Sequence, residues 1–247
     1  MIIADTEIQR PSSAMTPQET SELKQERDGV IRCSAWLGEL ELRHADCMDV
    51  MRETPDNAYD LAIVDPPYGI NVGDNKSGMG RRKGDAKATY KMGDWDSAPP
   101  PDEYFAELRR VSKNQIVWGA NHYIARMPLN SPCWIVWDKR FSNDVSFAAV
   151  ELAWTSFRTT AKKFECHPLQ DDRIHPTQKP VQLYSWLLAN YAEKGQRILD
   201  THMGSGSIAI ACYNHGYALT ACEIDKDYYD KALEIIKRET AQARLFS

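Results

Sequence analysis

The chain has 247 residues, a hydrophobic content of 43% and a net charge of −5, which fits one α/β domain able to bury a full core. The acidic balance excludes a wholly polycationic nucleic-acid binder, so any basic surface must be local. No apolar run approaches a membrane span, no signal peptide is recognisable, and the six scattered cysteines form no C-x-x-C pair, so we expect a cytoplasmic protein with reduced thiols and no membrane contact.

The periodicity of the chain predicts strands that alternate with helices, which is typical of a doubly wound, mainly parallel sheet. Residues 1–28 are polar and predict a flexible tail, so we expect a single domain over residues 29–247. In chain order, the predicted elements are a hairpin or added strand over Ile31–Trp36 and Glu39–His44, a helix over Cys47–Glu53, a strand over Leu61–Asp65, a helix over Asp102–Lys113, strands over Gln115–Ala120, Trp134–Asp138 and Ala148–Ser156, a helix over Val181–Ala192, a strand over Arg197–Asp200, a helix over Ser207–Asn214, a strand over Ala218–Asp225 and a helix over Lys226–Arg244.

The motif Asp65-Pro66-Pro67-Tyr68 directly follows the first clear core strand and is the most informative feature of the chain. Asp65 supplies a carboxylate, the two prolines stiffen the turn, and Tyr68 supplies a flat ring. These groups suit a planar base with an exocyclic amine, because the carboxylate and a backbone carbonyl can accept its two N–H groups. The alternative is an ordinary turn punctuated by proline. We take all four residues as catalytic candidates.

A basic loop over residues 70–100 follows this turn and shows no periodicity. A stretch of this length inside a compact domain is typical of a functional loop or of disorder. Its positive charge predicts contact with phosphate groups, against the alternative of a merely solvated loop. The candidate DNA-binding residues are Lys76, Arg81, Arg82, Lys83, Lys87 and Lys91.

A second motif, D-T-H-M-G-S-G over residues 200–206, joins a predicted strand to a predicted helix. Gly204 and Gly206 allow the backbone to turn tightly and approach a ligand. Glu223, at the end of the next strand, is placed to bind a ribose diol. The alternative is a helix N-terminus that needs small residues and is capped by a neighbouring serine. The missing third glycine argues against a dinucleotide.

Together, the two motifs resemble those of amino-group DNA methyltransferases that depend on S-adenosylmethionine. The catalytic motif precedes the glycine motif, which resembles the permuted beta class of N6-adenine and N4-cytosine enzymes. Further segments similar to those of the class are Ala45–Cys47, Trp134–Lys139 and His175–Pro180. The resemblance extends from about residue 42 to residue 239, and the chain looks most like small prophage-type members.

This resemblance implies a Rossmann-like, mainly parallel seven-stranded sheet with circularly permuted motif order. It implies site-specific methyl transfer to the N6 amine of an adenine flipped out of double-stranded DNA. Adenine is favoured because the motif begins with Asp65, whereas the cytosine enzymes of the class more often show Ser there. N4-cytosine methylation, methylation of adenine in RNA and a catalytically inactive nucleic-acid-binding subunit stay open as alternatives. No metal is needed, because the sulfonium is already an activated methyl donor.

The resemblance also implies where the cofactor binds. Asp46 or Cys47 would lie at its adenine edge, and Thr177 and Lys179 would reach its methionine carboxylate. The full set of expected S-adenosylmethionine-binding residues is Asp46, Cys47, Asp65, Thr177, Lys179, Asp200, Gly204, Gly206 and Glu223. Residues 201–203 depart from the usual Pro-Phe of the class. A zinc site at Cys166, His167 and His175 is not expected, since no second Cys pair is present.

Residues 157–174 are all that this chain offers as a target-recognition segment, which is minimal for the class. Such a short segment fits either relaxed sequence specificity or a homodimer that shares DNA contacts. The sequence leaves both open, along with the recognition site and the presence of a paired restriction enzyme.

Overall fold

The computed structural model describes residues 24–25, 30–34, 39–70, 96–128, 130–141, 148–168 and 178–243. The strands are β1 (Lys24–Gln25), β2 (Val30–Ser34), β3 (Glu39–His44), β4 (Tyr59–Val64), β5 (Ser112–Trp118), β6 (Trp134–Asp138), β7 (Val150–Thr155), β8 (Lys162–Glu165), β9 (Arg197–Asp200) and β10 (Ala218–Glu223). The helices are α1 (Cys47–Glu53), α2 (Asp102–Val111), α3 (Val181–Tyr191), α4 (Ser207–His215) and α5 (Lys226–Ala243), with short 3₁₀ turns η2 (Ala120–His122) and η3 (Ile124–Arg126).

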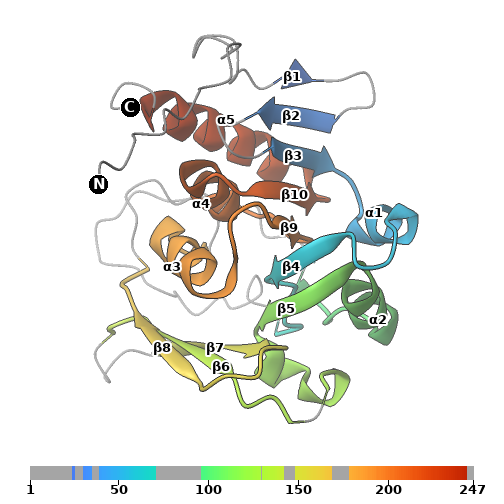
Figure 1. Cartoon of the computed structure of the whole chain (residues 1–247), viewed down its shortest axis with the longest axis vertical. Coiled ribbons are helices and arrows are strands. Elements are labelled where there is room, and N and C mark those ends of the chain that lie inside the picture. The colour runs from blue at the N-terminus through green and yellow to red at the C-terminus, as the bar shows by residue number, and fades with distance from the viewer. Residues whose placement is uncertain are drawn as a thin grey trace, which may run out of the picture.

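One mixed sheet runs through the molecule in the order β1-β2-β3-β10-β9-β4-β5-β7-β6-β8 (Figure 1). Its central strands β3, β10, β9, β4 and β5 are parallel to one another, whereas β2 pairs antiparallel with β3, and β7 pairs antiparallel with β5 and with β6. The chain leaves β9 towards β10 and leaves β4 towards β5, in opposite directions across the sheet. The junction of β9 and β4 is therefore a topological switch point, where α/β sheets bind ligands.

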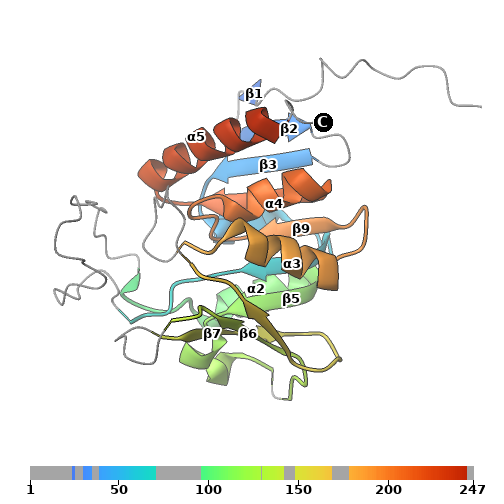
Figure 2. The same ribbon diagram turned by 90° about the vertical axis from the view of Figure 1, so that its left-hand side faces the viewer.

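Helices cover both faces of the sheet, with α3, α4 and α5 on one face and α1 and α2 on the other (Figure 2). The alternation of side chains along β4 explains the two layers. Leu61 and Ile63 pack into the cluster under α3, α4 and α5, while Ala62 and Val64 pack under α1 and α2. A strand that is apolar on both sides reads as a continuous hydrophobic run, as this one does. This confirms the Rossmann-like, doubly wound, mainly parallel architecture.

The sheet is wider than the seven strands expected, because the described residues include ten. Lys24–Gln25 lies inside the predicted tail but pairs with Arg32 and Ile31 of β2, which gives its backbone a partner at the sheet edge. Lys162–Glu165 lies inside the expected target-recognition segment and forms β8 beside β6. The rest of the predicted tail lies outside the described residues. No helix in the described ranges is both long and apolar enough to cross a lipid bilayer.

Several element boundaries differ from the prediction by one to three residues, and two of them have a clear local cause. The helix expected to reach Lys113 ends at Val111, because the chain turns extended at Ser112 and β5 begins there. The strand expected to reach Ala120 ends at Trp118, because Gly119 adopts a left-handed φ of 69° that cannot continue a strand.

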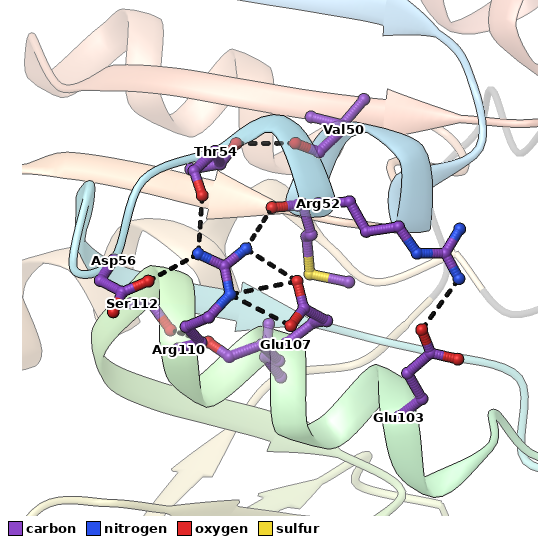
Figure 3. Close-up of polar contacts among 10 residues, drawn as sticks. Val50, Arg52, Thr54, Asp56, Glu103, Glu107, Arg110 and Ser112 are labelled. Carbon is purple, nitrogen blue, oxygen red and sulfur yellow. Dashed lines mark hydrogen bonds and ion pairs between the residues drawn. The ribbon is translucent and has the colours of Figure 1, made fainter.

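Arg110 joins the C-terminus of α1 to α2 (Figure 3). Its guanidinium donates to the carbonyl oxygens of Met51 at 2.6 Å and Thr54 at 2.8 Å. It also contacts the carboxylates of Asp56 and Glu107, each at 2.7 Å. Carbonyls at the end of a helix have no partner within it, so a cation there satisfies them and complements the helix dipole. Arg110 thereby fixes the direction in which α1 leaves β3.

Replacing Arg110 with Ala should lower the melting temperature by a few degrees, because two helix-end carbonyls and two carboxylates lose their common donor. Thermal unfolding followed by circular dichroism measures this. Lys226→Ala is the matched control, since Lys226 pairs only within α5, with Asp230. Equal melting temperatures for the two variants would contradict the role of Arg110.

Candidate functional site

Five polar side chains gather where the central parallel strands end. Asp46 follows β3, Asp65 follows β4, Asp200 closes β9 and Glu223 closes β10. β4 and β9 are neighbours, with Leu61 opposite Ile198 and Ala62 opposite Leu199. Parallel strands end at the same edge, so the turn of residues 65–68, predicted to be catalytic and called the catalytic turn below, meets the glycine motif there although the two lie far apart in the chain. Lys179, just before α3, completes the set.

Both oxygens of Asp65 are held by side chains of the site. Its Oδ1 accepts a hydrogen bond from the Tyr68 hydroxyl at 2.6 Å, and its Oδ2 pairs with the Lys179 ammonium. Burial, together with the neighbouring Asp65 carboxylate, raises the pKa of Tyr68 well above its usual range. Tyr68 therefore stays protonated and is the donor in this pair. The second lone pair of Oδ1 is left for another donor.

The turn after Asp65 is fixed by contacts that the sequence did not reveal. The buried carboxylate of Asp96 accepts from the backbone N–H groups of Tyr68 at 2.7 Å and Gly69 at 2.9 Å. The Tyr68 ring stacks on His122, with centroids 5.0 Å apart. The same ring packs directly against Gly119, where a Cβ atom would lie 2.1 Å from the ring. Gly119 is therefore required twice, for its left-handed φ and for the space that Tyr68 fills.

Lys179, which the sequence assigned to the cofactor carboxylate, has its ammonium beside Asp65 and Tyr68. The ammonium donates hydrogen bonds to Asp65 and, at 3.3 Å, to the Tyr68 hydroxyl, and it forms an ion pair with the Glu151 carboxylate at 3.1 Å. Burial lowers the pKa of Lys179, but the carboxylates of Asp65 and Glu151 outweigh burial and hold it above its ordinary value. Lys179 therefore belongs to the catalytic turn.

The glycine loop is tied to β10 by backbone contacts. The Met203 N–H donates to the Cys222 carbonyl at 2.8 Å, and the Gly204 N–H donates to the Glu223 carboxylate at 2.9 Å. Residues 201–203, which depart from the resemblance, thus pack without disturbing the loop. The two glycines differ in purpose. A Cβ at Gly204 would meet open space, whereas one at Gly206 would lie 2.8 Å from Ile236 of α5.

The start of α4 carries no side-chain cap, contrary to the serine cap considered as the alternative. Its N-cap is Gly206, with a φ of 77° and no side-chain hydrogen bond. Ser205 and Ser207 are buried and lie 3.1 Å apart, oxygen to oxygen. An uncapped helix N-terminus presents N–H groups and a positive dipole end to an anionic group. The loop therefore fits a ligand with a carboxylate.

Asp200 is a buried carboxyl with a strongly altered pKa. Its side chain accepts from the His202 N–H at 3.0 Å, and no described residue donates to its second oxygen. Burial, with Asp65 and Glu223 nearby, raises the pKa of Asp200 to about 8. Burial likewise raises the pKa of Glu223, against backbone hydrogen bonds from Asp225 and Gly204. An edge this rich in carboxylates attracts a cationic ligand.

Asp46 and Cys47 lie at the opposite side of the glycine loop. Asp46 caps α1 by accepting from the Met48 N–H at 2.8 Å. Burial raises the pKa of Cys47 to about 12, so it remains a thiol. Burial lowers the pKa of His202 to about 4, and its ring packs edge-on against Tyr104 with centroids 5.5 Å apart. These groups form a neutral wall beside Asp46 that suits a flat heterocycle.

Several predicted residues lie outside the described part of the chain. They are Thr177 and the basic-loop residues Lys76, Arg81, Arg82, Lys83, Lys87 and Lys91. Conversely, the sequence analysis missed Asp96, Gly119, His122 and Glu151. Glu151 did carry a signal, because it is the one acid in the otherwise mostly apolar strand β7.

Comparisons with known proteins agree with this geometry. A family model described as DNA methylase (N6_N4_Mtase) matches residues 118–234, just under half of the chain, including Lys179, the glycine loop and Glu223. YubD of Escherichia coli (strain K12), whose name describes a methylase, is 24% identical over 203 residues, covering 74% of this chain and 84% of its own. Type II methyltransferase M2.MboI of Moraxella bovis is 24% identical over 258 residues, covering 80% and 90%.

Two solved structures share the fold. The M1.HpyAVI–SAM complex superimposes with a TM-score of 0.50 and 18% identity, over 79% of this chain and 99% of that one. The PvuII DNA methyltransferase (cytosine-N4-specific) gives a TM-score of 0.54 and 10% identity, over 82% and 92%. At these identities the structures support the fold alone. The family match and the curated relatives support a DNA methyltransferase.

Replacing Lys179 with Met should lower the free energy of unfolding by about 3–5 kcal/mol at pH 8, because Asp65 would lose its cation and Glu151 would keep only Lys139. Without the lysine, the pKa of both carboxyls rises in the folded variant. They take up protons as the pH falls, so the difference from wild type should shrink at pH 5. Urea unfolding at both pH values measures this, with Lys113→Met, which breaks only the surface pair with Asp60, as control. A difference that does not depend on pH would contradict it.

Proposed function

We propose that this chain transfers a methyl group from S-adenosylmethionine to the N6 amine of an adenine that is flipped out of double-stranded DNA. Within the DNA methyltransferases it is proposed to belong to the permuted beta class. The observation that carries the proposal is the meeting of Asp65 and Asp200 at the ends of neighbouring parallel strands. An amine-binding turn and a glycine loop at one edge suit a reaction between a base and a nucleotide-type cofactor.

The residues at the edge fit S-adenosylmethionine in charge and shape. Asp200 and Glu223 are carboxyls facing a ligand that carries a sulfonium and an ammonium. Gly204 leaves open space above the backbone, and the uncapped start of α4 suits a carboxylate. We assign the ribose to Glu223 and the adenine edge to Asp46 and Cys47. When bound, S-adenosylmethionine supplies an activated methyl group, so no metal is invoked.

Asp65 is proposed to activate the target amine. The amine of adenine is a weak nucleophile, because its lone pair is delocalised into the ring. Its N–H groups would donate to Oδ1 of Asp65 and to the Pro66 carbonyl, which favours tetrahedral nitrogen and stabilises the positive charge that develops on transfer. Oδ2 is paired with the Lys179 cation, whereas Oδ1 has only the neutral Tyr68 hydroxyl, so we assign the substrate amine to Oδ1. Orienting the amine in this way contributes up to roughly 7–11 kcal/mol through proximity.

The target base must leave the duplex to reach this turn, at a cost of a few kcal/mol. We propose that the Tyr68 ring stacks on it, offsetting about 1–3 kcal/mol. One face of that ring already rests on His122, which would stiffen the platform. The basic loop, with Lys76, Arg81 and Lys91 among its residues, is proposed to hold the phosphates of the same strand.

N4-cytosine methylation is the second candidate, because the matching family model, N6_N4_Mtase, is named for both N6 and N4 methylation. Both reactions place an exocyclic amine before the same carboxylate and carbonyl. The Asp at the start of the motif is what favours adenine. A nucleoside analysis of the product separates the two.

Incubation of the protein with S-adenosylmethionine and unmethylated double-stranded DNA should yield N6-methyladenine, detected by nucleoside mass spectrometry. Asp65→Ala should lower turnover by at least roughly 10²–10³-fold, because the amine loses its charged acceptor. Calorimetry should show unchanged cofactor affinity in that variant. Asp60→Asn, at the other end of β4, is the matched control.

Three results would redirect this proposal. N4-methylcytosine would move it to the second candidate, and methylation of RNA alone, run in parallel, would change the substrate. Turnover in Asp65→Ala comparable to wild type would refute the role of Asp65.

Cofactor affinity should depend on pH through Asp200. With a pKa of about 8, this carboxyl is mostly protonated in the free protein below neutrality, whereas a cationic ligand requires the carboxylate. The dissociation constant should therefore fall about tenfold for each unit between pH 5 and pH 7, with release of a proton on binding. Calorimetry in buffers of different ionisation enthalpy measures both quantities. In Asp200→Asn the cofactor affinity should be weak and should not change with pH. If the dissociation constant of this variant kept the pH dependence of wild type, Asp200 would be rejected as the group responsible.

A further inference from the structure

Glu151 lies on β7, in the antiparallel part of the sheet and away from both sequence motifs. Its Oε1 lies 2.5 Å from the ammonium of Lys139, and its Oε2 lies 3.1 Å from that of Lys179. The side chain is 18% exposed. A buried carboxylate in a mostly apolar strand costs free energy unless it is paired, so its two cations explain its presence.

Lys179 depends on Glu151 as much as on Asp65. Its side chain is 2% exposed, and the ammonium lies 5.3 Å from the centre of the buried Trp118 ring. Among the described residues it is the one fully buried cation. Burying an ammonium costs several kcal/mol, and good geometry with hydrogen bonds to all its protons is needed to offset this. Without Glu151, the buried ammonium would keep one carboxylate, that of Asp65, to balance its charge.

We propose that Glu151 is a positioning residue for methyl transfer: it anchors Lys179, and Lys179 in turn fixes Oδ2 of Asp65 so that Oδ1 faces the substrate amine. This inference rests on the proposed function. A carboxylate can rotate about its last bond, and two oxygens with different partners remove that freedom. The Tyr68 hydroxyl at 2.6 Å marks the direction in which Oδ1 accepts. A residue on β7 thereby acts on the turn after β4.

The charged groups around Asp65 determine how the removal of Glu151 changes the pKa of Asp65. Burial raises the pKa of Asp65, Lys179 opposes this, and Glu151 adds to the rise. The other titratable groups facing Asp65 are Asp200 and the hydroxyls of Tyr68, Tyr123 and Tyr184, which burial keeps protonated. Burial raises the pKa of Glu151 itself, but Lys179 and Lys139 outweigh it and keep Glu151 ionised. Neutralising Glu151 therefore lowers the pKa of Asp65.

The test is Glu151→Gln, which keeps the shape and removes the charge. We expect kcat to fall roughly ten- to a hundredfold, as for a misplaced reacting group, with unchanged KM for DNA and unchanged cofactor affinity. While Lys179 stays paired with Asp65, the acid limb of the kcat–pH profile should move to lower pH, because the charge of Glu151 no longer raises the pKa of Asp65. Asp60→Asn, which loses an ion pair with Lys113 at the other end of β4, should leave both unchanged.

A second readout needs no activity. In ¹⁵N-labelled protein, the Lys179 ammonium should give an NMR signal that persists at neutral pH because the group is buried and hydrogen-bonded, and that is assigned by its loss in Lys179→Gln. In Glu151→Gln this signal should broaden or vanish through faster exchange with water. It should survive in Asp60→Asn.

The Glu151→Asp variant keeps the negative charge but shortens the side chain, so it separates the effect of the charge from the effect of its position. Its shorter carboxylate should lower kcat while leaving the acid limb near its wild-type position, and it carries the test if Glu151→Gln does not fold. Normal kcat, pH profile and ammonium signal in the folded Gln variant would overturn the inference. A wild-type protein that methylates nothing would instead overturn the proposed function, while the ammonium signal would still report on the contact between Glu151 and Lys179.

Discussion

The parallel pairing of β4 with β9 is the constraint on which the site depends. Two strands that run in the same direction finish at the same edge, and the register of Leu61 opposite Ile198 brings their ends level. The connections that follow diverge, with α2 covering one face and α4 the other. Asp65 and Asp200 therefore lie at one edge of the sheet, at the point where the connections diverge.

That edge of the sheet carries more carboxyl groups than cations, which indicates a site for a ligand. Burial is the largest cause of the raised pKa of Asp65, Asp200 and Glu223, and the carboxylates of Asp65 and Glu223 add to the rise at Asp200. Lys179 compensates Asp65 and Glu151 but lies on the catalytic side. Asp200 has only a backbone N–H partner in the described structure. A free protein with this arrangement stores unfavourable charge that a cationic ligand relieves.

The two sides of the site are stiffened by different means. The catalytic turn is held from outside, by Asp96 on its N–H groups, His122 against the tyrosine ring and Lys179 on the carboxylate. The glycine loop is held through its own backbone, by Cys222 and Glu223 of the next strand. Side chains can be exchanged singly, whereas backbone ties follow from the fold. Variation in chemistry is therefore easier at the turn than at the loop.

Much of the site followed from local sequence. Both motifs, the apolar run that ends in Asp-Pro-Pro-Tyr and the strand followed by a glycine segment, can be recognised from a few consecutive residues. This is possible because strand ends and tight turns are local properties of the chain. Lys179 was singled out but given another partner, since a motif names a residue and not the direction of its side chain. Asp96 could not be found, because nothing near it in the chain marks it as a partner of Tyr68 and Gly69.

By itself, the sequence determined the alternation of strands and helices, the order of the two motifs and the residue types available for the reaction. These are set by periodicity and by chemistry within short windows. Only the tertiary structure decided that β9 enters beside β4, that Glu151 on β7 reaches Lys179, and that Gly206 serves packing against Ile236 while Gly204 stays open. Each of these contacts joins segments that are distant in the chain. Local sequence patterns are compatible with many such arrangements, and the packed core selects one of them.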